Sequence, residues 1–572
     1  MEKVDLVVRI AGESGEGIIS AGEILTMACA RASFNVNTYR SYPAEVRGGQ
    51  SMFQMRASNS VIYSAGDDVD ILVALNQEAY DRHIASLRNG GILVYDPAET
   101  NPHSRGDLLL YAAPFKEMAV RTLQALQVKN IVMMGVIAQL FAMPLDKLEE
   151  IVREKFGRKG QGILEKDLQA LNLGAQYARE HIRKCDPFQL GQAEGRGKMV
   201  LSGNVAIALG ALCAGCRFFA GYPITPASDI LETLMVEMPK VDGVAIQVED
   251  EISALSMVVG ASFAGKKAMT ATSGPGLSLM VEMLGLATIV ELPLVLVDVQ
   301  RAGPATGIPT KTEQGDLFIG LFGAHGDCPR IVLAPTTVEE CFYQTIYAFN
   351  LAERTQMPVI ILTDQALAQR YETIAVPDFS ALSLEDRLTV TPEEVAKGYQ
   401  RYRLTPNGLS PIGIPGRPGA YIARGLEHNE NDIPNYDQKN HQAMCEKRAR
   451  KLDLALRDER LNSERWGDPS SEFGIIGWGS TLGATREASL ALKAEGQEPD
   501  VLYLKLLNPL PREEILRFLA NKRRVMAPEI NYTGQLSWLL RSAFLFEPIP
   551  FKIAGGRPFS AAEILEKAKE VR

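Results

Sequence analysis

The sequence is short of cysteine, of charge of one sign and of long apolar runs, and each shortage excludes a class of protein. Its 572 residues include seven scattered cysteines, which is no disulfide framework and fits a reducing compartment. Lys and Arg number 60 against 69 Asp and Glu, without a long basic run. We therefore expect neither nucleic acid nor an anionic membrane surface as the main partner.

Membrane and export signals are also missing. The most apolar helix-like run, 131–145, is about fifteen residues long, whereas a helix that spans a bilayer needs about 20. The first residues, MEKVDLVVRIAG, lack the basic start and apolar core of a signal peptide. The expected location is the cytoplasm.

A single Cys-x-x-C pair is present, Cys213 and Cys216, in the small, apolar stretch GALCAGCRFF. Structural zinc and iron–sulfur clusters want about four ligands, and no second pair supplies them. Core packing is the favoured interpretation and redox or metal chemistry the alternative. We expect no metal site in this chain.

The chain is long enough for several domains, since a single core rarely extends beyond about 300 residues. Strand-like runs alternate with helix-like runs, which predicts an α/β fold with mainly parallel sheets. The polar stretch 186–198 reads as a linker, and 377–465 is irregular apart from one charged helical run. The predicted division is a glycine-loop domain (1–190), a second α/β domain (196–375), a connector with a solvated helix (376–470) and a third α/β domain (471–572).

Two glycine clusters near the N-terminus are candidate ligand-binding loops. Gly12-Glu-Ser14-Gly15-Glu-Gly17 lies between a predicted strand (5–10) and a predicted helix (18–31), where backbone N–H groups and the helix dipole attract phosphate. The second cluster, 42–51, places Arg47 beside Gly48. Arg40 ends the next strand-like run and suits a phosphomonoester such as that on coenzyme A. A tight structural turn remains an equal alternative.

Four motifs follow in the second domain: Gly221-Tyr-Pro-Ile-Thr-Pro226, Gln247-Val-Glu-Asp-Glu251, Thr272-Ser-Gly-Pro-Gly276 and Asp298-Val-Gln-Arg-Ala-Gly-Pro304. Together with the C-terminal APEINYTGQL they resemble the thiamine-diphosphate-dependent 2-oxoacid:ferredoxin oxidoreductases. The order of the glycine-loop domain before the YPITP domain resembles the fused gamma–alpha subunit of the 2-oxoglutarate type. The resemblance covers essentially the whole chain and implies that the second and third domains are transketolase-like, a thiamine pyrimidine-binding domain and a C-terminal domain.

The resemblance implies a role for Glu251. Thiamine diphosphate generates its own base when a carboxyl group bonded to its pyrimidine drives the ring to the imino tautomer. In thiamine enzymes this Glu precedes a helix of small residues, and Gly260 follows Glu251 at the fitting distance. Glu249 and Asp250 are neighbouring carboxylates, so the choice rests on spacing. A solvated acidic strand end is the alternative.

The other motifs imply further contacts. Thr225, fixed between two prolines, would face the thiazolium ring and the substrate. Arg301 would pair with the substrate carboxylate, with a structural salt bridge as the alternative. The predicted cofactor-binding residues are listed together: Tyr222, Pro223, Ile224, Ser273, Gly274 and Pro275 for thiamine diphosphate, and Gly12, Ser14, Gly15, Arg47 and Gly48 for coenzyme A.

Half of a thiamine site is missing. Thiamine enzymes hold the diphosphate and Mg²⁺ through Gly-Asp-Gly, and this sequence has Gly-Asp pairs such as Gly315-Asp316 but no Gly-Asp-Gly. It also has no cysteine cluster for electron transfer. The resemblance therefore implies a beta subunit that brings diphosphate binding, Mg²⁺ and an iron–sulfur cluster, in an alpha2–beta2 heterotetramer that reduces ferredoxin.

The leading hypothesis is an alpha subunit that converts 2-oxoglutarate and coenzyme A to succinyl-CoA and CO2. Pyruvate or branched-chain 2-oxoacids are alternative substrates. A transketolase or lipoamide-linked decarboxylase component is an alternative enzyme, and a non-enzymatic coenzyme A- or nucleotide-binding assembly subunit is a third possibility. In the connector, Gly425-Leu-Glu-His428-Asn-Glu430 resembles a segment near the substrate entrance, although a lone histidine is more often structural.

Overall fold

The computed structural model describes residues 4–43, 48–103, 106–191, 193–194 and 198–572. The chain divides into two compact units. Unit 1 comprises Met1–Ser202, Gln369–Pro377 and Ser560–Ala562, and unit 2 comprises Gly203–Ala368, Asp378–Phe559 and Glu563–Arg572. The finer four-part division expected from composition stays a prediction.

Unit 1 is built on an eight-stranded sheet that is parallel at one end and antiparallel at the other. The pairings among β6, β5, β4 and β1 are parallel, and those from β1 through β3, β2 and β14 to β7 are antiparallel. In sheet order the strands are β6 (Leu109–Ala112), β5 (Leu87–Tyr95), β4 (Val69–Ala74), β1 (Asp5–Glu13), β3 (Gln50–Ser58), β2 (Asn35–Ser41), β14 (Tyr371–Ile374) and β7 (Met199–Ser202).

The sequence analysis did not predict the antiparallel half of this sheet. Strand β3 begins at Gln50, inside the glycine cluster that we read as a loop, and β14 comes from a segment more than 300 residues later. A strand whose partner is as remote as that of β14 leaves no local turn signal. The α/β class itself is confirmed.

The helices of unit 1 include one close-packed pair. Helix α4 packs on α6 where two glycines let the backbones approach. A Cβ on Gly135 would lie 2.1 Å from the Leu171 carbonyl oxygen, and one on Gly174 would lie 2.0 Å from that of Val132. The apolar run 131–145 is therefore largely a buried core helix. The helices are α1 (Ile18–Arg31), α2 (Gln77–His83), α3 (Phe115–Glu117), α4 (Lys129–Leu140), α5 (Leu145–Phe156) and α6 (Gln161–His181).

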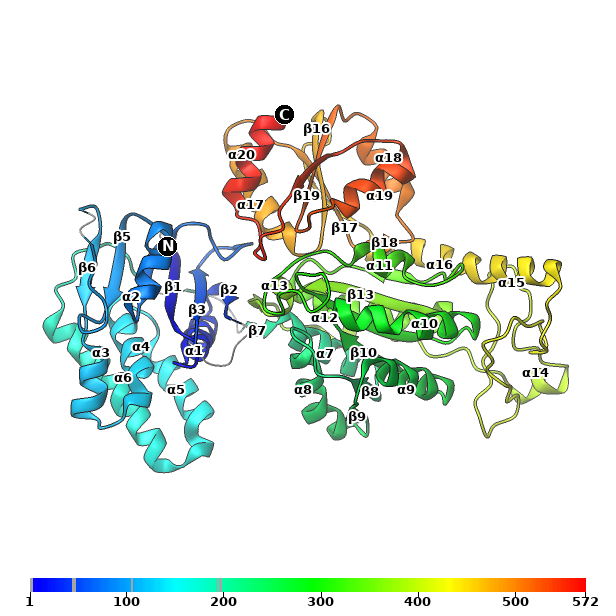
Figure 1. Cartoon of the computed structure of the whole chain (residues 1–572), viewed down its shortest axis with the longest axis horizontal. Coiled ribbons are helices and arrows are strands. Elements are labelled where there is room, and N and C mark those ends of the chain that lie inside the picture. The colour runs from blue at the N-terminus through cyan, green and yellow to red at the C-terminus, as the bar shows by residue number, and fades with distance from the viewer. Residues whose placement is uncertain (1–3, 44–47, 104–105, 192, 195–197) are drawn as a thin grey trace. The chain divides into compact units, whose positions relative to one another are not determined.

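The central sheet of unit 2 has seven strands, parallel except for β18. Its strands, in sheet order, are β18 (Leu506–Asn508), β12 (Ile331–Leu333), β13 (Pro358–Asp364), β11 (Leu294–Gln300), β10 (Ala268–Thr272), β8 (Phe218–Gly221) and β9 (Val244–Gln247). Helix α7 packs on α12 and α9 on α10 (Figure 1). The helices are α7 (Gly203–Cys213), α8 (Ser228–Glu237), α9 (Glu251–Phe263), α10 (Gly274–Ile289), α11 (Leu317–Phe322), α12 (Val338–Thr355) and α13 (Gln365–Ala368).

A second sheet of unit 2 lies near the C-terminus and shares its core with the central sheet. The buried cluster that contains Leu296 and Val332 also contains Ile476 and Trp478, so the two sheets form one compact unit. The five strands, in order, are β15 (Glu464–Gly467), β17 (Asp500–Leu504), β16 (Phe473–Trp478), β19 (Arg524–Glu529) and β20 (Ile549–Lys552). The helices are α17 (Leu482–Ala494), α18 (Arg512–Leu519), α19 (Gln535–Phe544) and α20 (Ala561–Val571).

The connector contains α14 (Pro392–Ala396), α15 (Gln438–Arg450) and α16 (Asp453–Leu456). Helix α15, which we expected to be solvated, has a buried face. The Lys447 and Lys451 side chains are fully buried on Glu291, at 2.5 Å in the case of Lys447. We predicted a solvated helix from its charge alone. The buried acidic partner of Lys447 lies 156 residues away in the chain, so the local sequence could not reveal it.

Candidate active site

The loop that carries Thr225 connects β8 to α8 and is held from two sides. The guanidinium of Arg301 donates from Nη1 to the Thr225 carbonyl oxygen at 2.7 Å. Asn204 donates from Nδ2 to the Pro226 carbonyl oxygen at 2.8 Å. Tyr222 is 40% exposed at the start of this loop, and Ile224 and Thr225 are half-buried. Thr225 and Arg301, two predicted catalytic residues, are thus in contact.

Burial distinguishes the three neighbouring carboxylates. Asp250 is the N-cap of α9 and accepts the Ser253 N–H at 2.7 Å, while Glu249 is exposed. Glu251 is the first residue of α9 and only 6% exposed. Of these three carboxylates, Glu251 is therefore the buried one.

The Thr-Ser-Gly-Pro-Gly turn joins β10 to α10 and packs directly against Glu251. A Cβ on Gly276 would lie 2.0 Å from Thr272 Oγ1 and 2.6 Å from Glu251 Cγ, so any side chain at this position would displace the carboxylate. By contrast, a Cβ on Gly260 would meet nothing within 4 Å. Gly276 is therefore the glycine that packs closely against Glu251. The sequence analysis did not predict this contact.

A cavity of about 760 Å³ opens beside this turn, within unit 2. Its lining includes Gly274, Pro275 and Arg301, together with the loop that precedes α19. Ser273, at the N-cap of α10, is fully buried, and its hydroxyl has no hydrogen-bond partner in the described part of the chain. A guanidinium and the N-terminal turn of a helix on one cavity favour an anionic ligand there.

Arg301 is a buried cation near two acidic side chains. The side chain is 8% exposed, and its Nε–H has no partner among the described residues. Burial lowers the pKa of Arg301, and the charges of Asp316 and Glu251 oppose that shift. The charges of two acidic side chains thus act on the guanidinium, and its Nε–H is left for a ligand.

A further acidic pair lies at the same place, which the sequence analysis missed. Asp298, near the end of β11, and Asp316, before α11, lie close enough for each to act on the pKa of the other, and neither carboxyl oxygen of Asp298 has a hydrogen-bond partner among the described residues. Burial, and then the neighbouring charge, raise the pKa of Asp298 well above its usual range. Burial raises the pKa of Asp316 to about 6. Asp316 was noticed in the sequence only as a Gly-Asp pair without the second glycine.

The predicted coenzyme A loops lie in unit 1, where they adjoin each other. The Ser14 N–H donates to the Gly49 carbonyl oxygen at 2.9 Å, which links the turn that follows β1 to the Gly48 turn. Gly15 and Gly48 both have positive φ, 91° and 85°. Arg47 falls outside the described residues.

Glu16 folds back into the first of these loops. Its Oε2 accepts the Glu13 N–H at 3.0 Å, and its Oε1 pairs with Lys129 Nζ at 2.7 Å. The Glu16 carboxylate therefore already accepts from one of the backbone N–H groups with which the glycine loop could bind an anion. Arg40, the candidate phosphomonoester contact, pairs with Glu23 at 3.1 Å.

Two protein families match this chain, one within unit 1 and the other mainly within unit 2. The family described as "Pyruvate ferredoxin/flavodoxin oxidoreductase" matches residues 7–177, and "Pyruvate flavodoxin/ferredoxin oxidoreductase, thiamine diP-bdg" matches residues 209–447. The 2-oxoglutarate oxidoreductase subunit KorA of Mycobacterium tuberculosis is 35% identical, over 98% of this chain and 90% of that protein. The chain belongs to the 2-oxoacid:ferredoxin oxidoreductase alpha subunits.

Further relatives agree with this family. The 2-oxoacid:ferredoxin oxidoreductase subunit alpha of a Sulfolobus species is 30% identical, over 97% of this chain and 95% of that protein. The solved 2-oxoglutarate:ferredoxin oxidoreductase of Magnetococcus marinus is 42% identical, covers 100% of both chains and superimposes with a TM-score of 0.94. That structure has 2-oxoglutarate, coenzyme A and succinyl-CoA bound. Our chain is accordingly an oxidoreductase subunit of the α/β class.

The C-terminal loop of this alpha subunit fixes the wall of the cavity. Gln535 donates from Nε2 to the Gly315 carbonyl oxygen at 2.7 Å, and Gln314 donates its backbone N–H to Ile530 at 2.6 Å. Glu529 is fully buried and accepts the Leu536 N–H at 2.6 Å. The APEINYTGQL segment therefore both caps α19 and positions the loop that carries Asp316.

The connector histidine is structural in its contacts. His428 is fully buried, its Nδ1 lies 2.9 Å from the Leu426 carbonyl oxygen, and its ring lies 3.9 Å from that of Tyr402. The Cys216 thiol is also buried and lies 3.4 Å from the Phe218 carbonyl oxygen. Burial raises the pKa of Cys216 to about 12, as expected for a packed rather than a reactive thiol.

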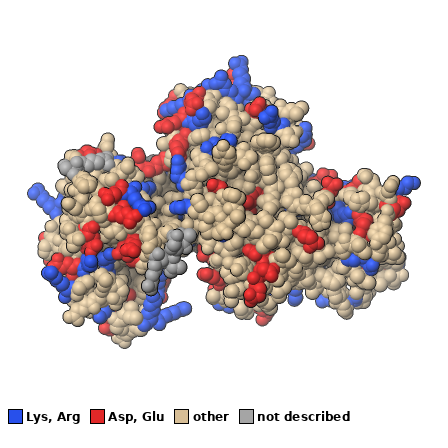
Figure 2. Space-filling view, viewed as in Figure 1, with Lys and Arg blue, Asp and Glu red and all other residues tan. Residues whose placement is uncertain are grey.

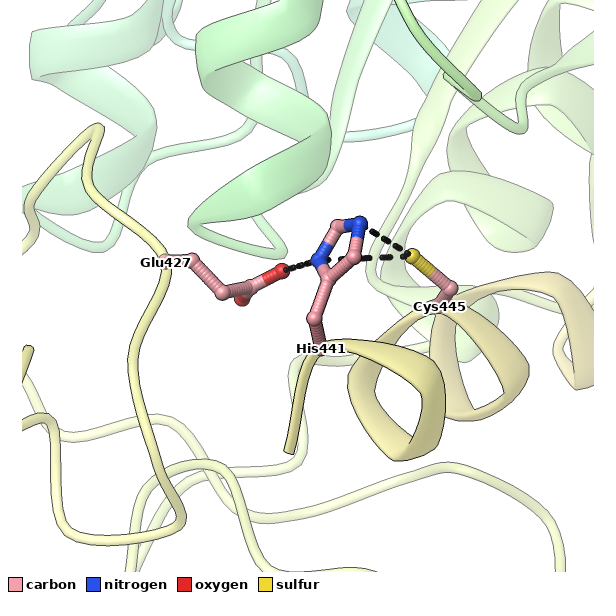
Figure 3. Close-up of side chains that lie close together, drawn as sticks. All are labelled: Glu427, His441 and Cys445. Carbon is pink, nitrogen blue, oxygen red and sulfur yellow. Dashed lines mark hydrogen bonds and ion pairs between the residues drawn. The ribbon is translucent and has the colours of Figure 1, made fainter. Parts of the chain in front are cut away.

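Figure 3 shows Glu427, His441 and Cys445 together, the first on a loop and the others on α15. His441 Nδ1 lies 2.6 Å from Glu427 Oε2, and the Cys445 Sγ lies 3.7 Å from His441 Nε2. Arg448 already pairs with Glu427 at 2.8 Å and lies 3.7 Å from the same sulfur. A cation would have to compete with that guanidinium. We therefore interpret the cluster as a network of hydrogen bonds and ion pairs that holds the loop against the helix.

The surface and the helices add two observations about partners. Acidic and basic side chains are interspersed on the face drawn in Figure 2, without the continuous basic track that follows a phosphate backbone. Within the described residues, no helix has both the length and the apolar character needed to cross a bilayer.

Proposed function

We propose that this chain is the alpha subunit of an enzyme that converts 2-oxoglutarate and coenzyme A to succinyl-CoA and CO2 and passes the electrons to ferredoxin. The observation that carries the proposal is the buried Glu251 carboxyl group against Gly276, beside a cavity lined by Arg301. The Magnetococcus marinus relative, at 42% identity over the whole chain, supports the choice of substrate, because its structure has 2-oxoglutarate and succinyl-CoA bound.

The chain's residues fit the pyrimidine end of thiamine diphosphate. When bound, that cofactor supplies the carbon nucleophile for attack on the 2-oxoacid. Glu251, buried beside a glycine turn, would hold a proton at the pyrimidine nitrogen. Tyr222, Pro223 and Ile224 would contact the cofactor from one loop. Ser273, Gly274 and Pro275 would contact it from the other.

Thr225 and Arg301 would handle the substrate. Their contact at 2.7 Å uses the Thr225 carbonyl oxygen, which leaves the threonine hydroxyl and the other guanidinium N–H groups for the 2-oxoacid. A guanidinium pairs with a carboxylate through two parallel hydrogen bonds, which orients the substrate as well as binding it.

A beta subunit would complete the site with Mg²⁺, the diphosphate-binding motif and an iron–sulfur cluster, in an alpha2–beta2 assembly. Exposed apolar side chains support a partner surface near the cavity: Ile252 on α9 (48% exposed), Leu279 on α10 (50%) and Tyr532 (82%). Trp538 on α19 (64%) extends this set. The subunit names of the relatives imply such a partner.

Coenzyme A would bind at the glycine loops of unit 1, through Gly12, Ser14, Gly15, Arg47 and Gly48. The linked turns and their positive-φ glycines support this assignment. In the assembled enzyme, Arg47→Ala should weaken coenzyme A use and leave the first half-reaction with the oxoacid largely unchanged. Equal loss of both half-reactions would contradict the assignment.

The experiment that tests the whole proposal is reconstitution with the beta subunit and measurement of ferredoxin reduction. We expect reduction to require both coenzyme A and 2-oxoglutarate, and iron to be found with the beta subunit rather than in this chain. Stoichiometric iron in the purified alpha subunit, or equal rates without coenzyme A, would refute it. The family descriptions name pyruvate. A higher kcat/KM for pyruvate would therefore establish the second candidate, a pyruvate-specific enzyme.

A further inference from the structure

The side chains drawn in Figure 3 have a second property, which concerns the thiol of Cys445. The imidazole ring of His441 lies between the Glu427 carboxylate and this sulfur. His441 Nδ1 is 2.6 Å from Glu427 Oε2, while Cys445 Sγ is 3.7 Å from Nε2 and 3.8 Å from Nδ1. A carboxylate accepts hydrogen bonds, so the Nδ1–H is committed to Glu427 and Nε2 is the nitrogen that can take the thiol proton.

Arg448 adds a fixed positive charge to this group. Its Nη2 donates to Glu427 Oε2 at 2.8 Å and lies 3.7 Å from Cys445 Sγ. Burial alone would raise the pKa of Glu427, but hydrogen bonds from Arg448 and His441 hold that pKa below its usual value. Glu427 therefore stays ionised and keeps His441 oriented. A guanidinium that opposes a bound metal cation also favours the negative charge of a thiolate.

A small reagent can reach this sulfur from two cavities within unit 2. Cys445 and Arg448 line a cavity of about 610 Å³ and another of about 360 Å³, and Glu427 and His441 line the second. Among the described residues, neither cavity shares a lining residue with the cavity beside Arg301. The reagent therefore does not have to enter the cavity proposed for the oxoacid.

Cys328 provides a comparison inside the same molecule, because it lines both of these cavities as Cys445 does. It also has a guanidinium near it: burial lowers the pKa of Arg330, and the Cys328 thiol opposes that shift. The Cys328 sulfur lies 3.1 Å from Thr288 Oγ1 and donates to the Leu284 carbonyl oxygen at 3.7 Å, and neither neighbour is a base. Access and a nearby cation are common to the two thiols, whereas the contact with an imidazole is found at Cys445.

We propose that Cys445 is a site of covalent modification, a thiol that hydrogen peroxide oxidises to the sulfenic acid with His441 as the base. The thiol proton passes to His441 Nε2, and the sulfur attacks one peroxide oxygen. An S–O bond forms and the O–O bond breaks, so the sulfur loses two electrons and the peroxide gains them. The departing hydroxide takes the proton from His441 and leaves as water. This step does not depend on the function proposed above.

The test treats the assembled alpha–beta enzyme with hydrogen peroxide at pH 7 and traps sulfenic acid with dimedone. Peptide mass spectrometry then reads each cysteine of this chain separately from those of the partner. An ordinary thiol is only a few per cent ionised at pH 7, so Cys445 should react about tenfold faster than Cys328 or the exposed Cys185. Equal rates at the three thiols, or an unlabelled Cys445, would overturn the proposal.

Variants of His441 separate its role as a base from its role in packing. His441→Ala should slow the oxidation of Cys445 about tenfold, and added imidazole should restore part of the rate. His325→Ala is the matched control, because it removes another histidine that lines the 360 Å³ cavity, and it should leave the rate unchanged. All variants should keep the wild-type denaturation midpoint. An unchanged rate in His441→Ala, a loss that imidazole does not restore, or an equal loss in His325→Ala would overturn the proposal.

Discussion

Unit 2 contains two buried charge clusters whose balance is opposite. Around Glu291, which is 1% exposed, the Lys447 and Lys451 ammonium groups meet one carboxylate oxygen, and Arg401 donates to the Glu291 backbone oxygen at 2.8 Å. Around Arg301, the charges of two carboxyl groups, Asp316 and Glu251, act on one guanidinium. Cations are in excess in the first cluster and anions in the second.

The difference appears in protonation as well. Burial alone would raise the pKa of Glu291, but Lys447, Lys451 and Arg401 outweigh it and hold that pKa far below its usual range. At Asp298 no cation opposes burial, and the pKa rises. A carboxylate surrounded by cations stabilises a fold. Here it holds the connector in place through Lys447 and Lys451. Carboxyl groups left without cations favour protonation and suit a reaction site.

The largest effect should follow loss of the Glu251 acid. Glu251→Gln keeps the size of the side chain but removes its proton, so turnover of the assembled enzyme should fall by about 10²–10⁴-fold, or roughly 3–5 kcal/mol. Glu249→Gln is the control and should stay within a few-fold of wild type, because Glu249 is exposed. Thiamine diphosphate should still bind. Comparable losses in both variants would contradict our choice among the carboxylates.

The Glu291 cluster should instead respond in stability. Glu291→Gln would leave two buried lysines without a counter-charge, which costs about 3–5 kcal/mol when one member of a buried ion pair is removed. We expect a lower denaturation midpoint, with kcat/KM per folded molecule close to wild type. Glu498→Gln breaks the surface ion pair of Glu498 with Lys493, whose side chains are 31% and 60% exposed, and should change stability by less than about 1 kcal/mol. Equal midpoints for wild type and Glu291→Gln would refute the structural role.

Two glycine substitutions test whether close packing against Glu251 matters for turnover. Gly276→Ala would force Thr272 or Glu251 to move, and overpacking of this kind typically costs about 1–3 kcal/mol. We expect turnover to fall by about 10–100-fold. Gly260→Ala meets open space inside a helix and should leave the chain as stable or more stable by up to about 1 kcal/mol. Equal turnover in the two variants would mean that the Gly276 contact has no function.

The smallest effect concerns stability and pH. The pKa of Asp316 is raised to about 6 in the folded chain, so the folded state holds a proton that the unfolded state gives up at lower pH. This contribution favours folding at low pH and is lost as pH rises toward 6. Asp316→Asn should therefore raise the melting temperature above pH 6, and the gain should shrink as pH falls toward 4. A gain independent of pH would contradict the raised pKa of Asp316.

The fold was predictable wherever local patterns decided it. Helix α1 spans Ile18–Arg31 as expected, because a glycine turn and an apolar face mark its start and extent. The candidate site residues Thr225, Glu251 and Arg301 came from motifs at strand ends, and parallel strands bring such ends together. Remote pairings left no such mark, as β14 and the lysines on Glu291 show.

The rest of the candidate site depended on three-dimensional packing. Asp316 lies in a loop without a motif, and only the structure shows that it packs against Gly274. The role of Gly276 follows from a close approach that no spacing rule reveals. The sequence supplied the candidate residues, and their burial distinguishes Glu251 from Asp250, which is committed to capping α9.

The central claim is that the buried Glu251 carboxyl group activates the cofactor in the assembled enzyme. Exchange of the thiazolium C2 proton of bound thiamine diphosphate for deuterium measures that activation before any substrate is present. We predict that exchange slows by about 10²–10⁴-fold in Glu251→Gln and stays near the wild-type rate in Glu249→Gln and Asp250→Asn. Wild-type exchange in Glu251→Gln, with slow exchange in one of its neighbours, would contradict the account.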